Sequence, residues 1–253
     1  MHSGKLGKQP KRGDPRTLKL SKYLKISELP AAPPAVDWTK AVPRYGVLLN
    51  DQLGDCVIAG MMHLAMGWQA NAGQTPATPS DSEVIAAYSA IGGYDPSDPS
   101  TDQGCNMLDA LNYWRETGIT IGGQTNQIVA FAEVNPANDE EMKAALWLFG
   151  GLFTGFQMPE SAENADSWTV PSCGLKGKGK PGSWGGHCAP LGAENGSCFQ
   201  AITWGELMPT MHNFVADYCE EAYAVLSSEW IEKNGQAPSG FDMAALQADL
   251  AAL

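Results

Sequence analysis

The stretch NDQLGDCVIAGMMH, residues 50–63, has a cysteine with a glutamine four residues before it. Cys56 begins an apolar run of helical periodicity, so its thiol is expected at or near a helix N-terminus. The helix dipole and free N–H groups there favour a thiolate, the nucleophilic form of cysteine. The side-chain amide of Gln52 could donate to the oxyanion that forms when a thiolate attacks a carbonyl. The stretch therefore predicts acyl transfer at Cys56, and the alternative is a buried thiol in an ordinary helix.

A cysteine nucleophile needs a base, and the chain has four histidines. His187 follows SWGG and begins a predicted strand, which is a rigid support, and its neighbour Gly186 leaves room for a substrate. The other histidines lie in the basic N-terminus, on the Cys56 helix and on a later predicted helix: His2, His63 and His212. We therefore predict the pair Cys56–His187. The alternative for His187 is a structural histidine that donates to a backbone carbonyl.

Positive charge is concentrated at the N-terminus. Residues 1–25 hold eight Lys and Arg against one acid, a net charge of +7, whereas the other 228 residues hold 8 basic and 27 acidic groups, a net of −19. Because this segment is also rich in Gly and Pro, we interpret residues 1–35 as a basic N-terminal arm. It is either a solubilising tail or an arm that docks on an acidic surface, of a neighbouring subunit or of the protein itself. Nucleic acid is disfavoured because phosphates would repel the acidic remainder.

Size and composition indicate a globular protein, with 253 residues of which 43% are hydrophobic and 17% charged. No apolar run approaches the roughly 20 residues that span a bilayer, and the N-terminus lacks the apolar core of a secretory signal peptide. We therefore expect a cytoplasmic protein with no membrane contact, whose six cysteines are mostly free thiols. None of them forms a CxxC pair, and we expect no metal and no cofactor.

The predicted elements place the cysteine among helices and the histidine among strands. Periodicity predicts helices over residues 56–72, 81–91, 107–118, 135–150 and 239–253. Strands are predicted over 151–159 and, as a pair joined by a turn, over 187–205, with a long loop at 160–186. The stretch 208–226 is predicted to be helical and is followed by a strand at YAVLSSEWI (223–231). Helices first and strands later indicate an α+β fold. We expect one domain over 36–253, with a helical half at about 50–150 and a β-rich half at about 151–235.

The order of these features resembles the papain-like cysteine peptidases. An Asp-Trp pair (37–38) is followed by a Gln and by the Cys that begins the central helix, and Gly-His comes much later in GGHCAPLG (185–192), before ITWG (202–205). The resemblance covers about residues 36–230. It implies a helical subdomain carrying the cysteine, packed on an antiparallel β subdomain carrying the histidine. The chain also resembles a group of papain-like proteins from bacteria and their phages that share the LNDxLGDC and TWG signatures, a group that brings a fold but no established activity.

Carried over residue by residue, the resemblance implies a role for several positions. Cys56 would be the nucleophile, and His187 would be the general base that later protonates the leaving group. Gln52 and the Cys56 backbone N–H would donate to the oxyanion, and Trp204 would shield the His187 side of the site. The neighbours that would line the site are Asp55 and Gly186.

The chain departs from the family pattern in three ways. The Gln-to-Cys gap is six residues in the family and four here, and the family's additional Cys between them is absent. The Asn that orients the catalytic His aligns with Ile202, which has no polar side-chain atom. Thr203 and Asn195 are the candidates to replace it, although strand alternation points Thr203 opposite to Ile202. Without such a partner, the tautomer of His187 is not fixed.

Two functions of different classes remain open. The first is a papain-like cysteine hydrolase, a peptidase or amidase that acts on peptide or amide substrates through a Cys-His dyad, with full, weakened or lost activity. The second is a non-catalytic papain-like scaffold, for example a structural or decoration protein of a phage virion. Its basic arm, residues 1–25, would then dock on protein subunits in a homo-oligomer or larger assembly, and the protein would be found in the phage particle.

Overall fold

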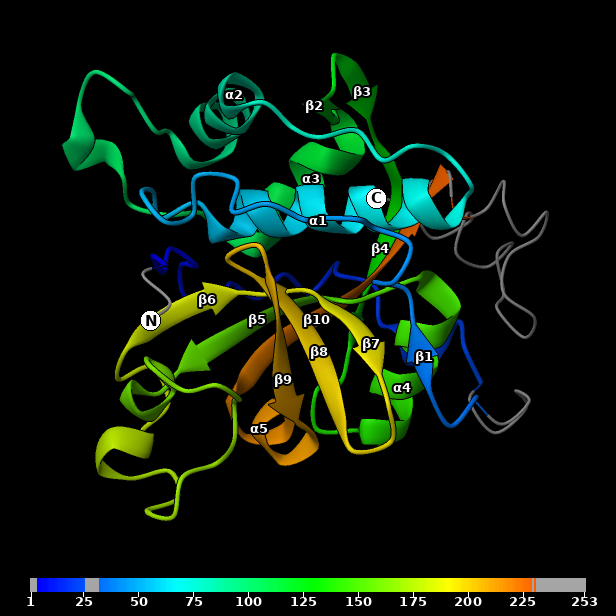
Figure 1. Cartoon of the computed structure of the whole chain (residues 1–253), viewed down its shortest axis with the longest axis vertical. Coiled ribbons are helices and arrows are strands. Elements are labelled where there is room, and N and C mark those ends of the chain that lie inside the picture. Colours follow the sequence, from blue (N-terminus) through cyan, green and yellow to red (C-terminus); the bar gives the residue numbers. More distant parts are fainter. Residues whose placement is uncertain (1–3, 26–31, 229, 231–253) are drawn as a thin grey trace.

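A computed structural model describes residues 4–25, 32–228 and 230, and the predicted helix at 239–253 lies outside these residues. The helix α1 (Cys56–Asn71) crosses the middle of the molecule, between a helical part and the strands (Figure 1). The helical part contains α2 (Asp81–Gly92), α3 (Met107–Glu116) and the hairpin of β2 (Ile119–Ile121) and β3 (Gln124–Asn126). None of the helices in the described residues is long and apolar enough to cross a membrane.

The strands form two antiparallel sheets of four strands each. The first has the order β4 (Ile128–Val134), β10 (Cys219–Ser227), β5 (Phe153–Met158), β6 (Gly185–Cys188). The second has the order β1 (Val36–Asp37), β7 (Leu191–Glu194), β8 (Cys198–Thr203), β9 (Glu206–Met211). Two further helices, α4 (Asp139–Phe149) and α5 (His212–Tyr218), pack on the strands. Short 3-10 turns occur at Leu20–Lys22, Pro99–Thr101, Glu160–Ala162 and Gly177–Gly179.

Helix α1 is buried along nearly its whole length, from Cys56 to Trp68. One apolar cluster packs α1 against α2 and α3, and a second cluster lies among α4, α5 and the sheet strands. A helix that is apolar on all sides is typical of a position inside a core. Cys56 therefore lies on the most enclosed helix, at the end that faces β6.

The α+β class and the packing of a helical part on antiparallel strands are confirmed, but the division of the chain into halves is not as simple as predicted. Strand β4 lies within the predicted helical half, yet it pairs with β10 along its length. Residues 206–211 form a strand, β9, and the predicted helix of this region is confined to 212–218. Short strands with few alternating polar residues, such as IVAFAEV in β4, give no clear periodic signal, which is why these elements were missed.

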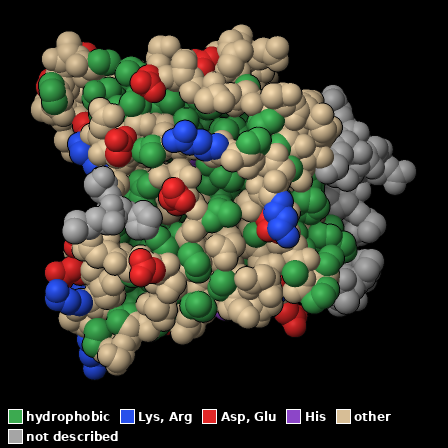
Figure 2. Space-filling view, in the orientation of Figure 1, with side chains coloured by type: hydrophobic (Ala, Val, Ile, Leu, Met, Phe, Trp, Pro, Cys, Tyr) green, Lys and Arg blue, Asp and Glu red, His purple; other side chains and the backbone are tan. Residues whose placement is uncertain are grey.

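Charged side chains on the face of the molecule seen in Figure 2 are scattered singly among hydrophobic and uncharged ones. The basic arm begins at the left in Figure 1 and runs, in dark blue, between α1 and the strands. Its Lys8 forms bridges with the segment before α3 and lies against β6. The arm thus lies across the junction of the helical part and the sheets.

Candidate active site

The thiol of Cys56 lies directly against the strand that carries the predicted histidine. Its Sγ accepts a hydrogen bond from the backbone N–H of Cys188 at 3.4 Å, and Cys188 follows His187 in β6. The residue is only 1% exposed, and burial raises the pKa of Cys56 to about 12. The thiolate expected at this helix N-terminus is therefore not the stable form in this structure, because burial outweighs the helix dipole.

His187 is completely buried and has one hydrogen-bond partner among the described residues. Its Nε2 lies 2.6 Å from Oγ1 of Thr203, whereas Nδ1 has no partner there. Burial lowers the pKa of His187 to about 3, so the imidazole is neutral. When Nε2 donates its hydrogen to Oγ1 of Thr203, Nδ1 of the neutral ring has a free lone pair and can accept a proton.

Trp204 covers one face of the His187 ring. The two rings are stacked with centroids 4.7 Å apart and an interplanar angle of 22°, and Trp168 contacts the histidine edge-on at 6.1 Å. Trp204 adopts a left-handed backbone with φ of 48°, which is rare for a large side chain. This uncommon backbone places the indole over the imidazole, where the resemblance had put the shielding tryptophan.

The two candidates for orienting His187 occupy opposite ends of β8. Thr203, at the last position of the strand, makes the hydrogen bond described above. Asn195 precedes the strand, and its Oδ1 accepts the N–H groups of Ser197 and Cys198 in the turn, so it does not reach the histidine. Ile202 packs in a separate apolar cluster with Val42, Tyr45 and Met66. Alternation does separate Thr203 from Ile202, and it is Thr203 that faces the histidine.

We expect Thr203→Val to destabilise the fold, because it leaves Nε2 of a fully buried imidazole without its hydroxyl partner. An unsatisfied buried polar group costs about 1–3 kcal/mol. The free energy of unfolding, measured by urea titration, should fall by this amount in Thr203→Val and much less in Thr203→Ser, which keeps the hydroxyl. Equal stability of Thr203→Val and the wild-type protein would show that the contact does not hold His187.

The predicted oxyanion donor, Gln52, is exposed on the turn before α1. A second side-chain amide in this turn belongs to Asn50, which is 2% exposed and donates from Nδ2 to the carbonyls of Leu53 at 3.1 Å and Lys5 at 3.2 Å. Asn50 stands six residues before Cys56, which is the family spacing, so the sequence did hold a signal for it. The prediction of Gln52 rested on its residue type rather than on its spacing to Cys56.

An unusual backbone precedes Asn50. Leu48 and Leu49 both have positive φ, at 56° and 65°, where a non-glycine residue is strained by about 1–3 kcal/mol. Asp55, between this turn and Cys56, is fully buried, and burial raises its pKa to about 8 while the Asn50 amide lowers it. Strained backbone and a buried acid next to a candidate nucleophile are both features of functional sites.

The N-terminal arm occupies the space over Cys56. The N–H groups of Lys8 and Gln9 donate to the carbonyls of Gly186 at 3.0 Å and Cys105 at 2.9 Å, and the Cys105 N–H donates to the Gly7 carbonyl at 2.9 Å. The Gly7 backbone N–H lies close enough to the Cys56 thiol to lower its pKa, against the larger effect of burial. The arm is thus held by its backbone in an extended form, as a bound peptide would be.

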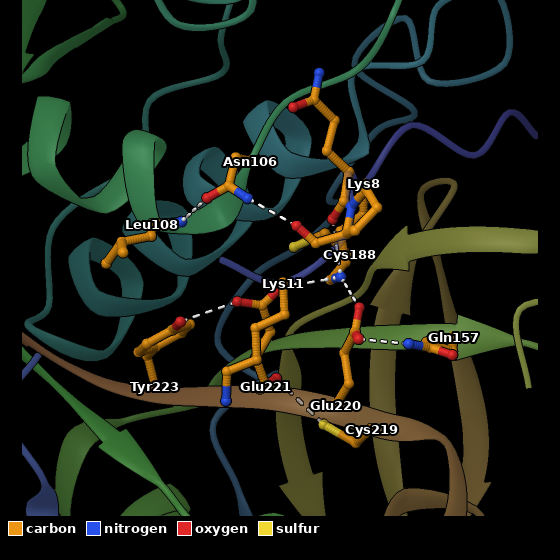
Figure 3. A network of polar contacts seen from close by, with 12 residues as sticks. Lys8, Lys11, Asn106, Leu108, Gln157, Cys188, Cys219, Glu220, Glu221 and Tyr223 are labelled. Atoms are coloured by element: carbon orange, nitrogen blue, oxygen red, sulfur yellow. Dashed lines mark hydrogen bonds and ion pairs between the residues drawn. The ribbon is translucent and has the colours of Figure 1, made fainter. Parts of the chain in front are cut away.

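The basic residues of the arm pair with acids of the protein's own body. Lys8 is the most deeply placed of them and contacts Glu220 and Glu221, as Figure 3 shows. Burial lowers the pKa of Lys8, but the two carboxylates more than offset this and raise it overall. The other pairs lie nearer the surface: Lys5–Asp102, Lys11–Glu133, Arg12–Asp109 and Lys19–Glu133. Docking of the arm on other subunits stays a prediction.

Comparison with known proteins shows the fold. No family model matches the chain, and no curated protein matches it. Among solved structures, it is similar to xylellain, a cysteine protease from Xylella fastidiosa, with a TM-score of 0.67 and 14% identity over 89% of this chain and 97% of that one. It is also similar to procathepsin B S9 from Trypanosoma congolense, with a TM-score of 0.60 and 11% identity over 89% of this chain and 87% of that one. A third similar structure is digestive procathepsin L 3 from Tenebrio molitor larval midgut, with a TM-score of 0.57 and 14% identity over 89% of this chain and 77% of that one. The chain therefore has the papain-like fold of these cysteine proteases.

Proposed function

We propose that this protein is a cysteine hydrolase, a peptidase or amidase, and that the docked N-terminal arm keeps it latent. Cys56 is the nucleophile, His187 the base and Thr203 the residue that positions His187. The observation that carries the proposal is the path of the arm: the Lys8 N–H donates to the carbonyl of Gly186, next to His187, and the neighbouring Gly7 backbone lies close enough to the Cys56 thiol to lower its pKa. A polypeptide backbone thus passes the thiol in an extended form.

The reaction would proceed by acyl transfer once another chain replaces the arm. His187 takes the thiol proton as the Cys56 sulfur bonds to the carbonyl carbon of an amide, and the oxyanion accepts hydrogen bonds. His187 then gives the proton to the departing amine as the C–N bond breaks, which leaves a thioester. Water hydrolyses the thioester to a carboxylic acid and restores the thiol. The Asn50 amide, which already donates to the carbonyl of Lys5, is the candidate oxyanion donor in place of Gln52.

Latency follows from two features of the docked state. The arm covers Cys56, and in this enclosed state the thiol and the imidazole are both held neutral by burial. A thiolate–imidazolium pair needs solvent or substrate dipoles to stabilise its charges. Two of the similar structures are by name proenzymes, a procathepsin B and a procathepsin L, which is consistent with a form that is inactive until a segment leaves.

The alternative, a non-catalytic assembly subunit gripping its neighbours through the arm, has less support. Five basic residues of the arm are engaged with acids of the same chain: Lys5, Lys8, Lys11, Arg12 and Lys19. An arm bound in this way cannot use the same charges on a neighbour without first leaving its own groove. The apolar Ile202 at the position of the family's orienting Asn is the feature that best fits lost activity.

Peptide hydrolysis is measured in a full-length chain whose arm is displaced by Gly7→Ala, since a Cβ at Gly7 would overlap the backbone of Gly54. We expect this variant to hydrolyse members of a mixed library of internally quenched peptides. Adding Cys56→Ser should reduce the rate at least about 1,000-fold, because a hydroxyl is intrinsically a far weaker nucleophile than a thiol. A rate unchanged by Cys56→Ser, or no hydrolysis by a chain whose Cys56 is demonstrably accessible, would favour the scaffold.

A further inference from the structure

We infer that the pocket that holds Lys8 recognises a basic side chain, a lysine or an arginine, of the polypeptide that takes the place of the arm. Glu220 and Glu221 are its specificity-determining residues. This inference rests on the proposed function, since it names the substrate class for the same cleft. It goes beyond the role of the arm as a cover, because it assigns to the pocket a ligand of defined charge.

The amino group of Lys8 lies in an enclosed acidic pocket. Its side chain is fully buried, with Nζ 2.9 Å from Oε1 of Glu221, in contact with Glu220 and 3.1 Å from the carbonyl of Gln9 (Figure 3). The Glu221 side chain is also fully buried, and that of Glu220 is 20% exposed. A pocket with two carboxylates and little exposure to solvent admits a cation much more readily than a neutral or acidic group.

The carboxylates of Glu220 and Glu221 are also held in place by hydrogen bonds from residues other than Lys8. Glu220 accepts a hydrogen bond from Nε2 of Gln157 at 2.5 Å, and Glu221 accepts one from the hydroxyl of Tyr223 at 2.9 Å (Figure 3). Both supporting residues lie on the strands β5 and β10, in the middle of the first sheet. The two carboxylates therefore remain positioned when the arm withdraws, and a preorganised site binds its ligand with less ordering cost.

The walls are shaped for an unbranched aliphatic stem. A Cβ at Gly155 would overlap Cδ and Cε of Lys8 as well as the sulfur of Met107, so only a glycine leaves this space open. Cys188 and Cys219 lie around the same pocket in Figure 3, and burial raises the pKa values of their thiols, which are therefore neutral. Neutral walls leave Glu220 and Glu221 as the source of charge selectivity.

The pocket lies one residue away from the reacting atoms. Lys8 follows Gly7, whose backbone lies close to the Cys56 thiol, and the Lys8 N–H donates to the carbonyl of Gly186 beside His187. A chain bound along the same backbone path would place a side chain in this pocket whenever an amide passes the thiol. The charge of that side chain would thus bear directly on which bonds are presented to Cys56.

The alternative is that the two glutamates only anchor the arm. To distinguish the two, we would use the full-length chain with Gly7→Ala and Lys8→Ala, which free the groove, and Cys56→Ala, which prevents cleavage. The probes are a fluorescein-labelled peptide with the sequence of residues 6–10, LGKQP, and the same peptide with norleucine for lysine. Norleucine keeps the aliphatic stem and lacks the amino group. Fluorescence anisotropy gives the dissociation constant of each.

We expect the lysine peptide to bind about 100-fold more tightly, because norleucine leaves buried carboxylates without a cation. Glu221→Gln should remove most of this difference in the dissociation constants of the two peptides, and Glu220→Gln should reduce it. Glu133→Gln, which alters an acid that pairs with the arm elsewhere, should leave it unchanged. Glu220 is partly exposed, so its variant tests the inference even where Glu221→Gln impairs folding. Equal binding of the two peptides, or no binding of either, would overturn the inference.

The same background with Cys56 retained separates this inference from the proposed function. Preferential binding of the lysine peptide without any hydrolysis in peptide libraries would contradict the proposed hydrolase and leave the basic-side-chain pocket standing. Hydrolysis that is equally fast for lysine and norleucine peptides would support the proposed hydrolase and contradict the basic-side-chain pocket. Faster hydrolysis of the lysine peptide would support both.

Discussion

Replacing Gly7 with alanine should release the arm and expose Cys56. A Cβ at Gly7 would overlap the backbone of Gly54, which cannot move aside as a flexible side chain could. Overpacking of this kind costs about 1–3 kcal/mol or more, and each 1.4 kcal/mol is a factor of ten in the docking equilibrium. We therefore expect the rate of iodoacetamide labelling of Cys56, read per cysteine by mass spectrometry at pH 7.5, to rise by roughly 10- to 100-fold.

The matched control for this change is Gly13→Ala, in the same arm. A Cβ at Gly13 meets no atom within 4 Å, so the docked arm accommodates it, and labelling of Cys56 should stay at the wild-type rate. Cys173, the exposed cysteine, reports on reagent and protein quality because it should label equally in all variants. Unchanged protection of Cys56 in Gly7→Ala would mean that burial of the thiol does not depend on the arm.

Replacing Asp55 with asparagine should stabilise the protein above neutral pH. Burial raises the pKa of Asp55 from 3.8 to about 8, so the unfolded chain loses its proton at a lower pH than the folded protein does. The free energy of unfolding therefore falls as the pH rises from about 4 to about 8, and it is not affected by this group below pH 4. Asparagine has no such proton, and at pH 7 the variant should be more stable by on the order of 4 kcal/mol.

The comparison is made by urea unfolding of both proteins at a series of pH values. The difference between the two curves isolates this carboxyl, because buried histidines and other groups contribute to both proteins alike. Asp51→Asn, at an exposed position in the same turn, is the control and should give a curve parallel to that of the wild type. A constant difference between Asp55→Asn and wild type from pH 4 to 8 would show that Asp55 ionises normally in the fold.

The sequence was sufficient to predict the α+β class, the central helix beginning at Cys56 and a histidine on a strand beside it. Helix α1 could be predicted because its apolar residues recur at helical spacing over about four turns, and polar residues follow at its C-terminal end. Strand β4 was missed because a short, largely buried apolar strand has the same composition as a buried helical segment. Strand β9 was missed because its residue types do not follow its burial: Leu207 is exposed and Thr210 is buried.

The details of the site depended on tertiary contacts that no local pattern encodes. Thr203 could be identified as facing His187 only once the register of β8 was known, since a shift of one residue exchanges the two faces of a strand. The raised pKa of Asp55 arises from burial, which is a property of the packed fold. The position of Asn50 could have been inferred from its six-residue spacing to Cys56.

The course of the arm was the least predictable feature. Its charge indicated an acidic docking surface, and its glycines and prolines indicated an extended form. The groove that receives it is formed by Gly54, Gly104 and Gly186, which come from three separate segments. Only the folded protein brings these glycines together and leaves room for a backbone.

The most direct test of the central claim is the pH dependence of iodoacetamide labelling of Cys56 in the full-length Gly7→Ala protein, with and without His187→Ala. An unperturbed thiol has a pKa of about 8.5, whereas a thiolate paired with an imidazolium at a helix N-terminus stays reactive several pH units lower. We predict that Cys56 labels at pH 5–6 in Gly7→Ala and loses this reactivity when His187 is also replaced. Labelling that begins only near pH 8.5, or that is indifferent to His187→Ala, would contradict a Cys56–His187 pair.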